Sequence, residues 1–134
     1  MRIFIIHSGS NYKEVIDIVN VIKNNFNRID LLIIKKGLPF IWKFAAIKNI
    51  KIADLILVVV GERSYQSKYI SWEIKTAISK NKEILIYKLN YKYRLPDSLY
   101  VKSEIIAETI NNFTVYDKDS FSKLIAYINK SDSK

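Results

Sequence analysis

The sequence predicts an α/β protein with a doubly wound parallel sheet of about five strands and helices on both faces. Two observations favour this class. Short apolar runs alternate with segments whose apolar residues recur every three or four positions, as in amphipathic helices. The run "ADLILVVVG" at 53–61 is apolar almost throughout, which is typical of a central strand buried on both faces. Strands that alternate with helices pair in parallel through crossover connections.

Each element is predicted from its own pattern. The expected strands are 2–6, 29–34, 53–61, 83–89 and 113–117, and the expected helices are 12–26, 42–50, 67–80, 98–109 and 120–129. Gly37 and Pro39 in "KKGLPF" predict a loop between the second strand and the second helix. The length of 134 residues suits a single domain, expected over 1–130, with a frayed tail over 131–134.

Composition limits the classes of function. No apolar stretch approaches the roughly 18 residues that a membrane span requires, and the N-terminal "RIFII" is too short for a secretory signal. We therefore expect a cytoplasmic protein without a membrane partner. The absence of Cys excludes disulfides and thiolate metal sites, and a single His argues against a zinc site, so no metal is expected.

The net charge of +9 raises the question of a nucleic-acid partner. The basic residues are spread along the chain with no Arg cluster, so nucleic acid is not the expected partner. Residues 31–53 nevertheless hold five Lys and no acid, which favours an anionic ligand, either a polynucleotide or a dinucleotide.

The predicted topology selects two loops as a ligand site. Five strands of this kind commonly take the flavodoxin-like order 2-1-3-4-5, and ligands bind outside the carboxyl ends of the strands where the chain order reverses. The loops at that point are 7–12 and 61–67. His7 there could contact an adenine or a ribose, and Ser8, Gly9 and Ser10 could direct backbone amides at a phosphate. An ordinary capped turn with a structural His explains the same residues.

Helix geometry places Glu73 close to this site. In the helix expected at 67–80, Ile70, Ile74 and Ala77 share one face, which must pack on the sheet. At about 100° per residue, Glu73 lies roughly 60° from Ile70, on a partly buried shoulder, and Trp72 points to nearly the opposite side. This position fits a surface acid, and it also permits a catalytic carboxylate.

Several segments together resemble bacterial TIR-like domains, and most of all the branch found in Thoeris antiphage systems. They are "IADLILVVVGE" (52–62), "SKYISWEI" (67–74) with Ala77, and "FIIHS" (4–8), in the family's order over about residues 1–90. The resemblance implies the flavodoxin-like sheet and cleavage of the nicotinamide–ribose bond of NAD, which is a substrate, so that no cofactor is needed. It also implies that Glu73 is catalytic. A product resembling cyclic ADP-ribose would reach a separate downstream effector.

The chain departs from the family pattern at two places. Tyr69 stands where the pattern usually has Trp, which keeps an aromatic wall of different size, and Ile6 replaces the usual Ser before His7. Ser67 is expected to cap the helix that carries Glu73, and ligand contact is a second role for it.

The basic segment after the second strand has several interpretations. Lys35, Lys36 and Lys43 could meet a pyrophosphate, and Phe40 or Trp42 could stack on a ring. The segment 35–44 could equally be a solvated loop, or form a self-association surface together with an outward-facing Trp72. That surface supports the alternative function, a TIR-like interaction or scaffold module without turnover.

Overall fold

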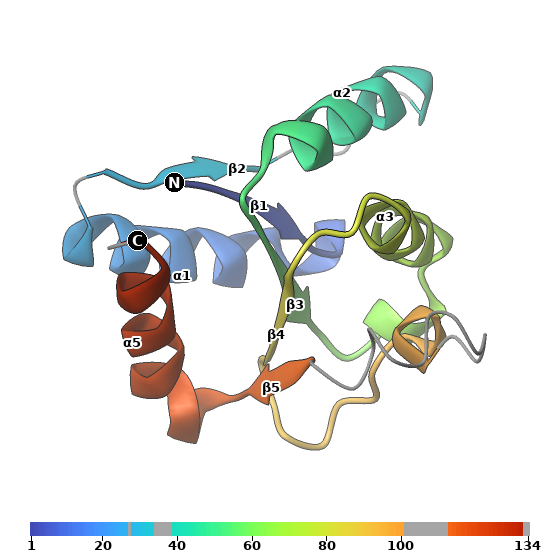
Figure 1. Ribbon diagram of the computed structural model, residues 1–134. Coiled ribbons are helices and arrows are strands. Elements are labelled where there is room, and N and C mark those ends of the chain that lie inside the picture. The colour runs from blue at the N-terminus through green and yellow to red at the C-terminus, as the bar shows by residue number, and fades with distance from the viewer. Residues whose placement is uncertain (27, 34–38, 101–112, 133–134) are drawn as a thin grey trace.

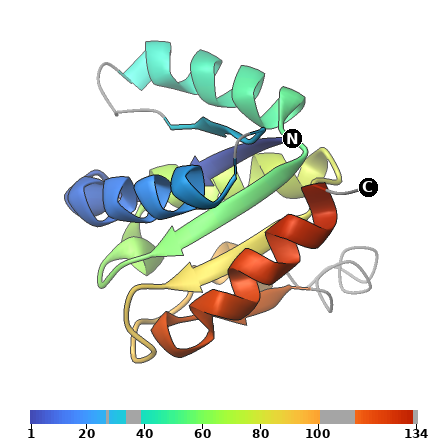
Figure 2. The same ribbon diagram turned by 90° about the vertical axis from the view of Figure 1, so that its left-hand side faces the viewer.

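Five strands form one parallel sheet in the order β2-β1-β3-β4-β5, which confirms the predicted topology. The computed structural model describes residues 1–26, 28–33, 39–100 and 113–132. The strands are β1 Arg2–Ile6, β2 Asp30–Leu32, β3 Leu55–Val60, β4 Ile84–Lys88 and β5 Thr114–Tyr116. All neighbouring strands pair in parallel, so their carboxyl ends lie at one edge of the sheet (Figure 2).

Helices cover both faces of the sheet (Figure 1). One face carries α1 (Tyr12–Asn25) and α5 (Phe121–Asp132), and the other carries α2 (Pro39–Ile52) and α3 (Lys68–Ser79). In the described part of the chain, short 3-10 turns are found at η1 Gly9–Asn11, η2 Ser64–Gln66, η3 Asp97–Tyr100 and η4 Lys118–Ser120. Within the described ranges, no helix has the length and apolar character needed to cross a membrane.

The sheet separates two apolar clusters. Successive side chains of a strand point to opposite faces, so Ile3 and Ile5 pack with α1 and α5, whereas Phe4 and Ile6 pack with α2 and α3. All six residues of β3 are buried, as its unbroken apolar sequence predicts for a central strand. The sheet therefore holds the carboxyl ends of β1 and β3 in a fixed position.

The start of α2 corrects the predicted loop at 35–40. Pro39 and Phe40 belong to the helix, which runs to Ile52 and is longer than the expected 42–50. Proline suits the first turn of a helix because its missing N–H would have no partner there. The spacing of Trp42, Ala46 and Ile50, all buried, then lays one face of α2 against the sheet and α3.

The C-terminal segment differs in its boundaries. A capping box between Asp117 and Ser120 opens η4, and α5 continues to Asp132, so residues 131 and 132 of the predicted frayed tail are helical. The Met1 amino group lies 3.7 Å from Asp132 Oδ1, which brings the start of β1 beside the end of α5. The predicted second strand shortens to Asp30–Leu32, and residues 101–109 of the predicted helix at 98–109 lie outside the described residues.

Candidate functional site

The loops after β1 and β3 meet at the carboxyl edge of the sheet. Strand β1 lies between β2 and β3, with Ile6 opposite Val58, so the chain order reverses at this point. Contact between the loops is close, because a Cβ built on Gly61 would stand only 2.0 Å from Asn11 Oδ1. The two loops that the sequence selects are therefore neighbours in space, as the rule for parallel sheets requires.

Ser64 organises the loop after β3. Its side chain is fully buried, and Oγ accepts a 2.8 Å hydrogen bond from the Gly61 backbone N–H. The backbone carbonyl oxygen of Ser64 accepts a 3.1 Å hydrogen bond from the Ser67 N–H. Ser67 Oγ in turn accepts from the Ile70 N–H at 3.2 Å, which confirms the predicted N-cap of α3. Sequence reasoning missed Ser64 and Asn11. A Ser three residues after a strand-ending Gly was the only signal for the first of them.

The turn after β1 has the geometry of a capped turn. His7 is buried, its Nδ1 lies 2.9 Å from the Ser8 carbonyl oxygen, and its ring centroid is 5.9 Å from that of Tyr12 at the start of α1. Ser8 caps η1 by accepting from the Ser10 N–H at 3.4 Å. Gly9 faces open space. Ligand contact by these residues stays a prediction.

Glu73 is more deeply enclosed than helix geometry alone predicted. Its exposed fraction is 2%, so the expected partly buried shoulder is wrong. The reason is the position of α2. On the helix surface Glu73 lies between the sheet-facing Ile70 and Tyr69, roughly 60° from one and 40° from the other, and Tyr69 contacts Trp42 of α2. Helix geometry therefore directs the side of α3 that carries Glu73 toward the junction of the sheet, α2 and α3.

Three aromatic rings join α2 to α3. The buried Trp42 ring meets Tyr69 edge-on at 5.0 Å and Trp72 edge-on at 5.4 Å. Trp72 is only half-exposed, and Lys43 Nζ lies 5.5 Å from its ring centroid. The expected outward orientation of Trp72 is corrected, because the ring packs against α2. Such edge-to-face pairs stabilise the packing of two helices beyond the area they bury.

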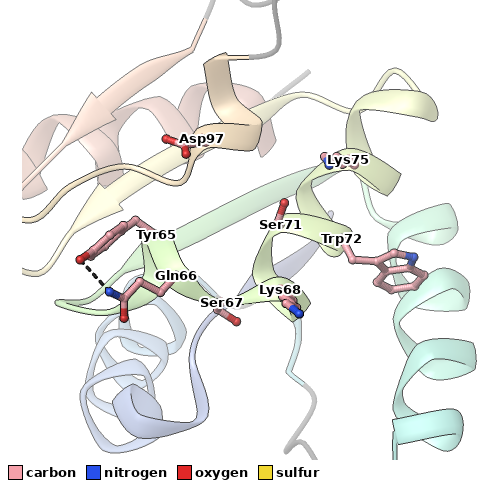
Figure 3. A pocket seen from close by; sticks show the side chains of 8 residues that line it. All are labelled: Tyr65, Gln66, Ser67, Lys68, Ser71, Trp72, Lys75 and Asp97. Carbon is pink, nitrogen blue, oxygen red and sulfur yellow. Dashed lines mark hydrogen bonds between the residues drawn. The ribbon is translucent and has the colours of Figure 1, made fainter.

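Two cavities flank the N-terminal turn of α3. The first, of about 670 Å³, opens between α2 and α3 and is lined by Lys43, Gln66, Ser67, Lys68, Tyr69 and Trp72; it is called the α2–α3 cavity below. The second, of about 390 Å³, shares four of these residues and continues past Ser71 and Lys75 to Asp97. Figure 3 shows its lining, with Trp72 directed toward α2 and Asp97 on the far side of α3.

The remaining predicted site residues are only partly placed. Lys35 and Lys36 lie outside the described residues, and Phe40 lies in the first turn of α2. Ser67 and Tyr69 line the α2–α3 cavity, whereas Glu73 lines neither of the two cavities above. The expectation that Glu73 faces the 7–12 turn stays a prediction.

Comparison with known proteins bears on this arrangement. Residues 45–94, which include β3, the Ser64 loop, α3 and β4, match the family described as Thoeris protein ThsB, TIR-like domain. The resemblance to Thoeris TIR-like domains is confirmed. No curated protein is significantly similar to the chain in sequence. Among solved structures, the CMP N-glycosidase BcmB of Clostridium botulinum is similar in fold, with a TM-score of 0.63 over 98% of this chain and 99% of that one. Identity to BcmB is 14%, so this likeness concerns the fold alone.

Proposed function

We propose that the protein cleaves the N-glycosidic bond of NAD and yields an ADP-ribose-derived signal in antiphage defence, with Glu73 as the catalytic residue. The observation that carries the proposal is the position of Glu73. It is a buried carboxylate on α3, the helix that follows the loop after β3, inside the segment that matches the Thoeris TIR-like family.

A buried carboxylate at this junction would destabilise the folded protein if packing were its only role. Removing an ionised carboxylate from water costs several kcal/mol in free energy unless surrounding groups compensate. A Leu or Gln of similar size would fill the space between Ile70 and Tyr69 at lower cost. Enclosed ionisable groups are often found at functional sites.

The chemistry needs one anion and no metal. Breaking the bond between the nicotinamide nitrogen and the ribose C1′ transfers the bonding electron pair to the ring, which leaves as neutral nicotinamide. The ribose becomes an oxocarbenium ion that a nearby carboxylate stabilises. Water then adds to C1′ and loses a proton to give ADP-ribose, or an adenine nitrogen adds to C1′ to give a cyclic product.

Glu73→Gln tests the role of the charge while it keeps the volume. We expect release of nicotinamide from NAD to fall by about 100-fold or more, because the transition-state cation loses its counter-charge. Nicotinamide and ADP-ribose products are quantified by mass spectrometry, with and without lysate of phage-infected cells. Circular dichroism and the melting temperature report whether the variant is folded.

Glu83→Gln is the matched control, since Glu83 is an exposed acid next to the amino end of β4. It should retain the parental rate. A folded Glu73→Gln protein that releases nicotinamide as fast as the parent would remove the catalytic role of this residue.

The likeness to BcmB over nearly the whole chain favours a second candidate substrate, a pyrimidine nucleoside monophosphate such as CMP. The same oxocarbenium chemistry would release the base. NAD and CMP are therefore assayed side by side, and release of cytosine in place of nicotinamide would select the second candidate. If neither base is released under any of these conditions, the scaffold module without turnover is the better explanation.

A further inference from the structure

The α2–α3 cavity combines two kinds of lining. Tyr69 and Trp72 supply aromatic walls, and Lys43 and Lys68 supply two ammonium groups, whereas none of its six lining residues is acidic. Its volume of about 670 Å³ falls within the range of small-molecule sites, about 300–1,000 Å³. A ligand that matches this lining has a flat or apolar part and carries negative charge.

Lys43 is held in place at this cavity. Its ammonium group lies 5.5 Å from the Trp72 ring centroid, a cation–π contact, and Trp72 is itself fixed by the buried Trp42. A Lys side chain ordered in this way loses less conformational entropy when it binds an anion. Two ammonium groups around one cavity also repel each other, and a bound anion would relieve this repulsion.

The neighbouring cavity is less suited to an anion. It shares Lys68 and adds Lys75, but Asp97 lies at its far end with 78% of its side chain exposed, paired to Arg94 at 3.2 Å. The Asp97 carboxylate would repel a bound phosphate. The charge of the lining therefore favours the α2–α3 cavity of the two.

Tyr69 connects this cavity to Glu73. The two residues are four positions apart on α3, so their Cβ atoms are about 6 Å apart on the same side of the helix. Tyr69 is 45% exposed and lines the cavity, whereas Glu73 is buried and does not line it. The rise of one helical turn along the axis is similar to the distance between the 5′-phosphate and the anomeric carbon of a nucleotide.

On these grounds, and resting on the proposed glycosidase function, we propose that the α2–α3 cavity binds the 5′-phosphate or pyrophosphate of the substrate through Lys43 and Lys68. The substrate class is then a nucleotide and not a free nucleoside. Lys43 and Lys68 are binding residues, and Tyr69 lies between the phosphate site and the carboxylate.

ADP-ribose is the probe, because it carries the pyrophosphate and has no nicotinamide to lose. Its dissociation constant is measured by titration calorimetry for the parent, Lys43→Met and Lys68→Met, with adenosine as the uncharged comparison. We expect each variant to bind ADP-ribose about five- to tenfold more weakly, the loss of one charge-assisted contact. Parental binding of ADP-ribose should exceed that of adenosine and should weaken with salt.

Lys75→Met is the matched control, since Lys75 is on the same helix and lines only the neighbouring cavity. Its affinity should equal that of the parent. Equal affinities for ADP-ribose in the parent, Lys43→Met and Lys68→Met would overturn the proposal. So would a larger loss in Lys75→Met, or no binding of ADP-ribose by the parent.

The binding assay separates this inference from the proposed function. If ADP-ribose binding depends on Lys43 and Lys68 but the parent releases no base, the phosphate site stands and the glycosidase function fails. If the parent releases nicotinamide and both Lys variants bind ADP-ribose normally, the function stands and the phosphate site is wrong.

Discussion

At Gly61 the two loops of the candidate site are in close contact. The side chain of Asn11 fills the space where a Cβ would stand, at 2.0 Å for Oδ1 and 2.5 Å for Cγ. Since Gly61 has no positive φ, steric contact and not backbone conformation is the reason that glycine fits here. A single hydrogen atom in place of a methyl group thus allows the loops after β1 and β3 to touch.

We expect Gly61→Ala to reduce the free energy of unfolding by about 1–3 kcal/mol, because Asn11 must move to admit the methyl group. Chemical denaturation measures the change. In a double-mutant cycle, adding Asn11→Ala should recover part of the loss, since it removes the atoms that clash. Gly9→Ala is the control without a clash, because no atom lies within 4 Å of its built Cβ. An effect of Gly9→Ala as large as that of Gly61→Ala would contradict this explanation.

The element that carries Glu73 has well-defined ends. Ser67 caps α3 at its N-terminus, and at the C-terminus the Asn81 N–H donates to the Ile78 carbonyl oxygen while the Lys82 N–H donates to that of Ala77. These two bonds form a Schellman motif, in which the residue after the cap adopts a left-handed conformation. Asn81 has that conformation, with a φ of 55°. Both ends of α3 are therefore anchored, which fixes the depth at which Glu73 enters the junction.

Substitutions at residue 81 test the C-terminal anchor. Asn81→Ala should cost about 1 kcal/mol in unfolding free energy, because Cβ crowds the backbone at positive φ and Ala lacks the local hydrogen bonding of Asn. Asn81→Gly should stay within about 0.5 kcal/mol of the parent. Lys80→Ala, one position earlier at a φ of −96°, is the control and should be close to neutral. Thermal melts of the three variants measure these changes in stability. Equal losses of stability in Lys80→Ala and Asn81→Ala would exclude backbone conformation as the cause.

The face of the sheet that carries α1 and α5 has its own apolar cluster. It contains Tyr87 and Tyr116, which are paired across β4 and β5 and are both buried. Burial raises the pKa of the Tyr87 phenol, and Asp117 raises it further. Burial also raises the pKa of Tyr116; a hydrogen bond with Thr114 opposes the shift, and Glu83 adds to it.

These raised pKa values predict a loss of stability at alkaline pH. In the unfolded chain both phenols lose their protons near the ordinary value of 10.0, while the folded chain still holds them. The unfolded state then binds fewer protons, so stability is fully present below this value and falls as pH rises above it. Melting temperatures from about pH 9 to about pH 11 should fall less steeply in Tyr87→Phe and Tyr116→Phe than in the parent. Tyr91→Phe, at an exposed position, should follow the parental curve, and identical slopes in all four proteins would refute the linkage.

Local patterns were sufficient for the fold. The unbroken apolar run of β3 and the spacing of Val15, Ile18 and Ile22 in α1 are properties of short segments, and parallel pairing follows from their alternation. Chain length and turn residues predict boundaries less well. Pro39 indicated a break in the sequence yet begins a helix, since the same missing N–H is harmless in the first turn.

Local patterns in the chain predict the strand order, the two loops at the switch point, and the place of Glu73 on a helix that leaves a buried strand. The depth at which Glu73 is enclosed and the set of side chains around the α2–α3 cavity are properties of the folded chain that these patterns do not predict. The physical reason is that a helical pattern reports the orientation of a residue relative to its own helix. The cover that α2 provides, and the meeting of Lys43 with Lys68 and Trp72, depend on how two helices pack side by side on the sheet.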